Sequence, residues 1–122
     1  ILLIIKRRYN IFYMRKLDLT PYEIDVRTES GKTTKSYGVR ESLIEILFSP
    51  VLKLGSVALL RQNSLAQKIE KSGLECIVEE EEYERIKQAL DSVTGLGIHD
   101  VKFVEMILGA PEVTVEEQTN QQ

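Results

Sequence analysis

The chain is poor in the residues from which many small proteins build disulfide or metal sites. Its 122 residues include one cysteine, Cys76, one histidine, His99, and no tryptophan. The single cysteine excludes an internal disulfide and any metal site that needs several cysteines. We therefore expect a fold held by a hydrophobic core, with no metal and no cofactor, and a cysteine usage that fits a reducing cytoplasm.

The chain has no excess of positive charge. Lys and Arg together number 16, against 19 Asp and Glu, so the formal net charge is −3. Binding to nucleic acid needs a local concentration of basic side chains, and Lys32 and Lys35 are too few to provide one. The sequence therefore predicts no nucleic-acid partner.

Long hydrophobic runs are missing as well. The apolar run Ile1–Ile5 has five residues, whereas a transmembrane helix needs about 20. A secretory signal carries its positive charges before the apolar run, but here Lys6, Arg7 and Arg8 follow it. We expect no membrane partner.

Residues 1–13 differ in composition from the rest of the chain. They contain no acidic residue, Gly, Pro, Ala or Ser, and all their residue types can be encoded by A/T-rich codons. We predict that they are an over-extended reading frame and that Met14 is the start; a genuine N-terminal extension is the alternative. Without them the chain loses three positive charges and becomes distinctly acidic.

The first half of the remaining chain predicts a β-hairpin followed by a helix. Residues 22–27 alternate between apolar and charged side chains, which is typical of a half-buried strand. A Ser-Gly turn at Ser30 and a weaker alternation beyond it complete a hairpin from Tyr22 to Val39. Helical spacing then follows and ends at Ser49-Pro50, with a stripe formed by Leu43, Ile44, Leu47 and Phe48.

The middle of the chain allows two readings. We favour two short helices, 57–61 and 65–72, with Ser56 and Ser64 as caps, over one continuous helix. Gly73 is placed to stop the second helix in a left-handed conformation. Residues 74–78 form a short β-branched run, which predicts a strand.

The last third predicts two helices and a strand. The first helix is indicated by the spacing of Tyr83, Ile86, Leu90 and Val93. The second is indicated by the spacing of Val101, Val104, Ile107 and Leu108, and Gly109 and Pro111 end it. Together they would form an αα-hairpin. Val113 and Val115 alternate with polar residues and could add an edge strand to the hairpin, and residues 116–122 should form a disordered tail.

These elements predict an α+β fold with one globular domain, residues 14–115. An N-terminal β-hairpin, joined in one arrangement by the C-terminal edge strand, would pack on four to five short helices. The length of the chain and its 43% hydrophobic and 29% charged residues suit a single soluble domain.

The most conspicuous polar feature is an acidic run, Glu79, Glu80, Glu81 and Glu82, followed by Glu84. Consecutive helical positions point in different directions around the axis, so at most two of these carboxylates can converge on a cation. Glu residues in the first turn of a helix also oppose the positive end of the helix dipole. We therefore interpret the run as a solvated helix start that can also present an acidic surface to a partner.

Other candidates for chemistry lack the necessary neighbours. His99 borders Asp100, but adjacency at a helix start does not orient an imidazole, and there is no Gly-x-Ser-x-Gly turn. Cys76 lies in an apolar run without nearby basic residues and should be a small buried side chain. Gly95–Gly97 follows a helix rather than a strand and makes no phosphate cradle. The sequence predicts no enzyme and no small-molecule substrate.

The segments LTPYEIDV, YGVRESLIEILFSP, EEEEYERIKQAL and DVKFVEMILGAPEV occur in this order between Leu17 and Val115. This order resembles small uncharacterised proteins encoded in phage and prophage gene clusters, in which a short hairpin leads into helices and an acidic tail. The resemblance implies a virion-assembly accessory or a host-directed inhibitor, in the bacterial cytoplasm or incorporated in a virion. It transfers no functional residues, because its motifs are generic helix and strand patterns.

Two functions of different kinds follow. The first is a non-enzymatic interaction protein that oligomerises or docks, because a free hairpin edge can pair with another chain and residues 43–54 are richer in apolar side chains than one helix needs. These are Leu43, Ile46, Leu47, Phe48, Val51, Leu52 and Leu54. The second is an acidic regulator that covers a basic surface of another protein, with Glu79–Glu82, Glu84 and the acidic C-terminal segment as its contact residues. A small hydrolase would need a pocket around His99, which the sequence does not predict.

Overall fold

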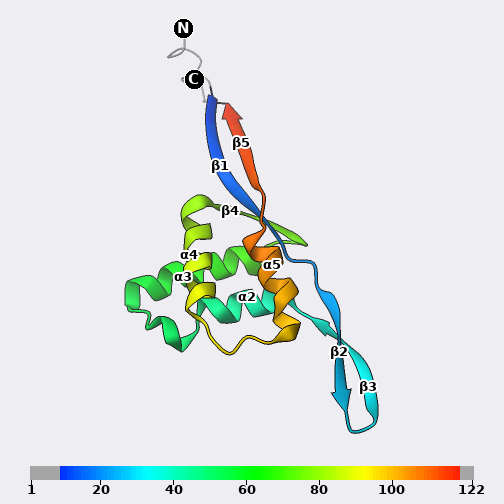
Figure 1. Ribbon diagram of the computed structural model, residues 1–122. Coiled ribbons are helices and arrows are strands. Elements are labelled where there is room, and N and C mark those ends of the chain that lie inside the picture. The colour runs from blue at the N-terminus through cyan, green and yellow to red at the C-terminus, as the bar shows by residue number, and fades with distance from the viewer. Residues whose placement is uncertain (1–8, 119–122) are drawn as a thin grey trace.

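The structure, a computed structural model, describes residues 9–118, and the side chains of residues 13–115. It confirms the α+β class. The elements are β1 (Tyr9–Asp18), β2 (Tyr22–Thr28), β3 (Gly31–Tyr37), α2 (Val39–Leu47), η1 (Pro50–Leu52), α3 (Ser56–Lys71), β4 (Glu75–Glu79), α4 (Glu80–Ser92), η2 (Ile98–Asp100), α5 (Val101–Leu108) and β5 (Glu112–Gln118). The helices form a central body, and β-ribbons extend from it at two ends (Figure 1).

The larger sheet is antiparallel, with strand order β4-β1-β5. β1 pairs with β4 near the body, where Leu17 lies opposite Cys76, and with β5 further out, where Tyr9 lies opposite Gln118. The outer parts of β1 and β5 therefore continue as a two-stranded ribbon that leads away from the helices (Figure 1).

This sheet corrects the prediction for the C-terminal strand. β5 pairs with β1 and not with the hairpin of β2 and β3, which forms a separate two-stranded sheet. β1 was not predicted at all. It runs without a break through Tyr13 and Met14, while residues 1–8 of the predicted extension lie outside the described residues. β5 reaches Gln118, so Glu116–Gln118 belong to the sheet and not to a tail.

The β2–β3 hairpin is confirmed, with Tyr22 opposite Tyr37 at its base. The two tyrosine rings stack with centroids 4.7 Å apart, and Tyr37 also lies against Phe103 of α5, at 5.9 Å. Gly31, which begins β3, has φ of +113°, a conformation that L side chains rarely adopt. The tyrosines thus fasten the hairpin to the body, while its far end projects from it (Figure 1).

The middle of the chain is one continuous helix, α3, so the favoured reading of two short helices is wrong. Ser64 lies inside the helix and caps nothing, and the residue before the helix is Gly55. The helix ends at Lys71 with Ser72 extended, and Gly73 does not adopt the predicted left-handed conformation. α2 and β4 are confirmed as a helix and a strand close to their predicted bounds.

The last two helices pack as an antiparallel pair. The hydroxyl of Tyr83, near the start of α4, donates to the backbone oxygen of Ile107 at the end of α5, at 2.9 Å. The predicted stripe of α4 is buried at Tyr83, Ile86 and Leu90. The predicted stripe of α5 is confirmed at Ile107, which is buried, and Val104 packs against the core from a partly buried position. It is wrong at Val101 and Leu108, which are exposed, and it missed the buried Phe103.

The core lies between the helices and one face of the β1–β4 pair. Leu17, Cys76 and Val78 are its contributions from the sheet. The buried hydrophobic residues are Leu17, Leu19, Val39, Leu43, Ile46, Leu47, Leu65, Ala66, Ile69, Cys76, Val78, Tyr83, Ile86, Ala89, Leu90, Phe103, Ile107 and Ala110. Several of the largest are completely enclosed, and each α-helix of the described chain is anchored by at least one buried side chain.

Candidate functional site

The acidic run surrounds the start of α4, as predicted, but its members have different roles. Glu79 directly precedes the helix, and its backbone N–H donates to the carboxylate of Glu82 at 2.8 Å. Glu82 is almost fully buried and also accepts a hydrogen bond from Nζ of Lys68 on α3, at 2.7 Å. Glu82 therefore closes the helix start and ties α4 to α3.

The remaining acidic residues of the run are paired with basic neighbours. Glu80 lies 3.2 Å from Nε of Arg15, Glu81 lies 2.9 Å from Nε of Arg85, and Glu84 lies 2.9 Å from Nζ of Lys87. Most of the negative charge at the start of α4 is thus balanced locally. This arrangement weakens the field that an acidic regulator would need to present to a basic partner.

Arg15 is a structural cation that sequence reasoning did not single out. Its guanidinium lies 4.9 Å from the centre of the Tyr83 ring and donates to the backbone oxygen of Ala110 at 3.1 Å. Together with the ion pair to Glu80, these contacts join β1 to α4 and to the end of α5.

His99 and Asp100 lie in η2, close to the base of the hairpin, and they do not form a catalytic pair. His99 is exposed, and its backbone oxygen accepts a hydrogen bond from the hydroxyl of Tyr22 at 2.6 Å. Asp100 accepts from the backbone N–H of Gly97 at 2.8 Å and from the hydroxyl of Tyr37 at 2.5 Å. These hydrogen bonds lower the pKa of Asp100, the Gly97 contact most strongly.

Cys76 is buried, as predicted. Desolvation raises the pKa of its thiol above the ordinary value. A thiol in this state is a poor nucleophile, because the thiolate is the reactive form. Cys76 is a core side chain and not a reactive site.

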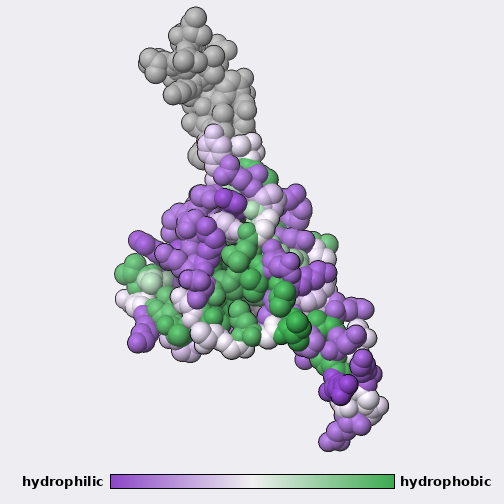
Figure 2. All heavy atoms as spheres, viewed as in Figure 1, coloured by the Kyte–Doolittle hydropathy of each residue, from purple (hydrophilic) through white to green (hydrophobic). Residues whose placement is uncertain are grey.

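The surface feature that we consider is a pair of hollows on either side of α4, the first lined by apolar and polar residues alike and the second mainly by apolar ones. Gln88 and Asp91, on the exposed side of this helix, line both hollows. We call this surface, with both hollows and the ridge of Gln88 and Asp91 between them, the α4 face. Figure 2 shows hydrophobic side chains gathered over this part of the body, bordered by hydrophilic residues.

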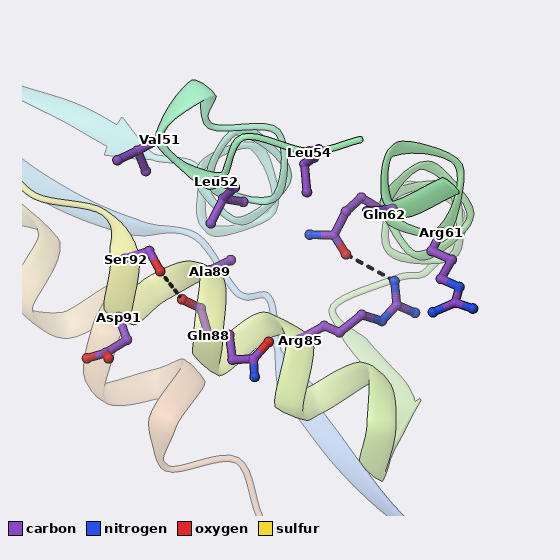
Figure 3. A pocket seen from close by; sticks show the side chains of 11 residues that line it. Val51, Leu52, Leu54, Arg61, Gln62, Arg85, Gln88, Ala89, Asp91 and Ser92 are labelled. Carbon is purple, nitrogen blue, oxygen red and sulfur yellow. Dashed lines mark hydrogen bonds between the residues drawn. The ribbon is translucent and has the colours of Figure 1, made fainter. Parts of the chain in front are cut away.

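The first hollow lies between η1, α3 and α4 and has a volume of about 460 Å³. Its apolar side chains are Val51, Leu52, Leu54, Ala58 and Ala89. At one end, Figure 3 shows Gln62 and Arg85 pointing toward each other, with Arg61 close to this end as well. Nη1 of Arg85 donates to Oε1 of Gln62 at 3.0 Å.

Gln62 is a buried polar residue with both ends of its amide engaged. Its Nε2 donates to the backbone oxygen of Leu47 at 3.1 Å, while its oxygen accepts from Arg85. Nε of Arg85 faces Glu81 at 2.9 Å, without hydrogen-bond geometry. The polar end of the first hollow is therefore held in place by contacts to α2, α3 and α4.

The second hollow lies between α4, the α4–α5 connection and α5, with a volume of about 410 Å³. Leu90, Leu96, Val104 and Leu108 supply its apolar lining. Leu96 is 43% exposed and Leu108 51% exposed, and the neighbouring Ile98 is 80% exposed. Val101 and Leu108 of the predicted α5 stripe thus belong to the surface, whereas Ile107 is buried and Val104 is partly buried against the core.

The first half of α3 extends this apolar surface. Val57 and Leu60 are 64% and 67% exposed, Leu59 is also exposed, and no residue from Ser56 to Arg61 is buried. This half of the helix lies at the outer edge of the helical body (Figure 1). A helix that is apolar on several sides is usually covered by other protein.

Two kinds of site are not found in the part of the chain that the structure describes. Within it, no group of three or more His, Cys, Asp or Glu side chains is arranged to hold a metal ion. No described helix is long and apolar enough to cross a membrane. Comparison with models of protein families, with curated proteins and with solved structures found no significant match.

Sequence reasoning anticipated part of this surface. The surplus of apolar residues around Val51, Leu52 and Leu54 was noted, and these three line the first hollow. The second hollow was missed, because its residues were placed in the core. Arg61, Gln62 and Arg85 were also missed, since no local pattern marks side chains that meet only after α3 and α4 pack.

Proposed function

We propose that this protein is a non-enzymatic interaction domain that docks to another protein chain through the α4 face. The observation that carries the proposal is the number of accessible apolar side chains on this side of the body, in the two hollows beside the polar ridge of Gln88 and Asp91 and in the exposed first half of α3. Isolated exposed apolar residues are common on proteins, but a contiguous group bordered by polar residues is typical of a protein-binding surface.

The energetic basis is the apolar area that remains in contact with water. Complete burial of a Leu side chain contributes roughly 1.5–3 kcal/mol. Leu108 is 51% exposed and Leu60 is 67% exposed, so covering either would contribute about 1 kcal/mol. Several such side chains on one face can support a stable complex even after the entropy cost of association.

The resemblance to small phage and prophage proteins supports a more specific role in virion assembly, within the bacterial cytoplasm or a virion. The alternative, an acidic regulator that covers a basic surface, has weaker support. Glu80, Glu81 and Glu84 are each paired with a basic side chain, and Glu82 is buried. The two functions differ in salt dependence, because electrostatic docking weakens with ionic strength while apolar docking does not.

A photo-crosslinking residue at Gln88, on the ridge of the α4 face, tests the proposal. We expect irradiation of the producing cells to give one defined crosslinked species, whose mass shows whether the partner is a second copy or another protein. The same residue at Glu29, on the hairpin turn, is the matched control and should give none.

A second substitution links the crosslink to the apolar surface. In the Gln88 variant, Leu108→Glu should abolish the crosslinked species, because it places a charge in the second hollow. Raising the salt concentration should leave the species unchanged. Absence of any defined crosslink from Gln88, together with a monomeric purified protein, would contradict the proposal.

A further inference from the structure

We propose that the first hollow binds an apolar protein segment that carries a carboxylate, and that Arg61 holds this carboxylate. The inference rests on the proposed function and deepens it, because it names the chemistry of the partner. It concerns the first hollow alone, so it can fail while docking through the second hollow remains.

The apolar part of the hollow sets the first requirement on the partner. Leu52 and Leu54 follow α2, Ala58 lies on α3 and Ala89 lies on α4, so three separate segments meet around the space. Its volume of about 460 Å³ falls within the range of roughly 300–1,000 Å³ that is usual for ligand sites. An aliphatic or aromatic side chain of a partner would be surrounded by these apolar residues.

The charges at one end set the second requirement. Arg85 is already held by Gln62 and Glu81. Arg61 also lines the hollow, is exposed, and forms no ion pair with any residue from 13 to 115. A guanidinium can bind a carboxylate through two parallel hydrogen bonds. A carboxylate placed at this end would gain Arg61 as a direct partner.

The opposite end of the hollow gives the segment a direction. Asp91 and Ser92 line this end, apart from the polar group around Gln62, as the close-up shows (Figure 3). A carboxylate near Asp91 would be repelled, while a carboxylate near Arg61 would be attracted. Charge complementarity thus favours a segment whose acidic group points toward α3, and it disfavours a basic segment, which would meet both Arg61 and Arg85.

Two fluorescent probes that differ in one charged group test this chemistry. They are 8-anilinonaphthalene-1-sulfonate, which is anionic, and N-phenyl-1-naphthylamine, which has the same rings without the sulfonate. We expect both to bind the purified full-length chain in the first hollow. Ala58→Trp, a substitution at an exposed position of α3 that fills the hollow, should remove this binding for both probes.

Arg61→Gln is the decisive variant. It should weaken binding of the anionic probe about threefold at low ionic strength, which is the usual size of an exposed ion pair. It should leave the neutral probe unchanged, and Arg61→Glu should weaken the anionic probe further. Arg27→Gln, which removes an exposed arginine from the hairpin, is the matched control and should change neither probe. Far-UV circular dichroism checks that each variant is folded.

Three results would overturn the inference. The first is that Arg61→Gln weakens binding of both probes equally. The second is that Arg61→Gln leaves binding of the anionic probe unchanged. The third is that Ala58→Trp does not reduce binding of the probes. If the neutral probe still binds in the hollow while the anionic probe ignores Arg61, the carboxylate is wrong and apolar docking stands. If the crosslink from Gln88 is missing as well, the proposed function itself is wrong.

Discussion

Glu82 and Glu84 belong to the same acidic run and the same helix, yet the structure predicts very different costs for their removal. The side chain of Glu82 is 11% exposed, and it accepts hydrogen bonds from the Glu79 backbone and from Lys68. The side chain of Glu84 is 56% exposed and contacts Lys87 only, three residues along the same helix. Because both residues are glutamates on α4, a difference between their substitutions reports the effect of burial and contacts on stability.

The expected magnitudes follow from these contacts. Glu82→Ala removes a helix-start hydrogen bond and an ion pair to a partly exposed lysine, and should lower the free energy of unfolding by about 2 kcal/mol. Glu82→Gln keeps an acceptor for the Glu79 N–H and should cost about 1 kcal/mol. Glu84→Ala removes an exposed ion pair and should change the free energy by roughly 0.5 kcal/mol or less.

Urea unfolding followed by circular dichroism measures these differences at neutral pH. In a thermal scan, Glu82→Ala should lower Tm by about 6–8 °C, on the scale expected for a chain of this length. Repetition in 0.5 M NaCl should abolish the small Glu84 effect and keep most of the Glu82 effect, because buried contacts are screened less. Equal losses for Glu82→Ala and Glu84→Ala would refute the view that burial separates the two residues.

Three further predictions concern the hairpin base, the core and the cysteine. The pKa of Asp100 is lowered in the folded protein, so its carboxylate contributes stability above its ordinary pKa of 3.8, and this contribution is lost as the pH falls through the folded pKa. Asp100→Asn should therefore destabilise the protein at pH 7 and have little effect near pH 2, which urea titrations at both pH values measure. Leu65→Ala in α3 should lower the free energy of unfolding by about 2–5 kcal/mol, because Leu65 is fully buried. Leu60→Ala on the same helix should change it by less than about 0.5 kcal/mol, because Leu60 is exposed. Comparable losses of stability in the two variants would mean that the exposed half of α3 is packed. The thiol of Cys76 should react with Ellman's reagent only slowly in the native protein and rapidly in urea, and fast native labelling would contradict its burial.

Local sequence patterns determined most of the individual elements. The alternation in β2, the spacing of Tyr83, Ile86 and Leu90 in α4, and the Gly109-Pro111 stop after α5 each act over a few residues, so the chain specifies them without distant partners. The same holds for the acidic start of α4. These elements were sufficient to predict the α+β class.

The strand pairing was decided only by the tertiary structure. β1 lies opposite β4 and β5, whose residues are about 60 and 100 positions away along the chain. In the part of β1 whose side chains the structure describes, residues 13–18, Leu17 alone is buried, and the buried Leu19 follows after the strand ends. Pairing between distant segments leaves little trace in a short pattern, which is why β5 was expected beside the hairpin.

α3 illustrates a local pattern that a tertiary contact overrides. Ser64 suggests an interruption, because a serine can cap a following helix turn, and Asn63 and Ser64 are only moderate helix formers. In the structure Gln62 is buried and bound to Leu47 and Arg85, so the helix continues through this segment. Packing against α2 and α4 supplies what the local propensity lacks.

The α4 face depends on the same distinction between periodicity and packing. The sequence determines that α5 is apolar, but the pair Phe103 and Ile107 and the pair Val104 and Leu108 both have helical spacing. In the structure the first pair is buried, while Val104 is partly buried and Leu108 is exposed. Only the positions of β1, α4 and the hairpin decide which side is buried. The chain alone therefore specifies how much apolar surface the helix has, and the tertiary structure decides which part of it remains exposed for a partner.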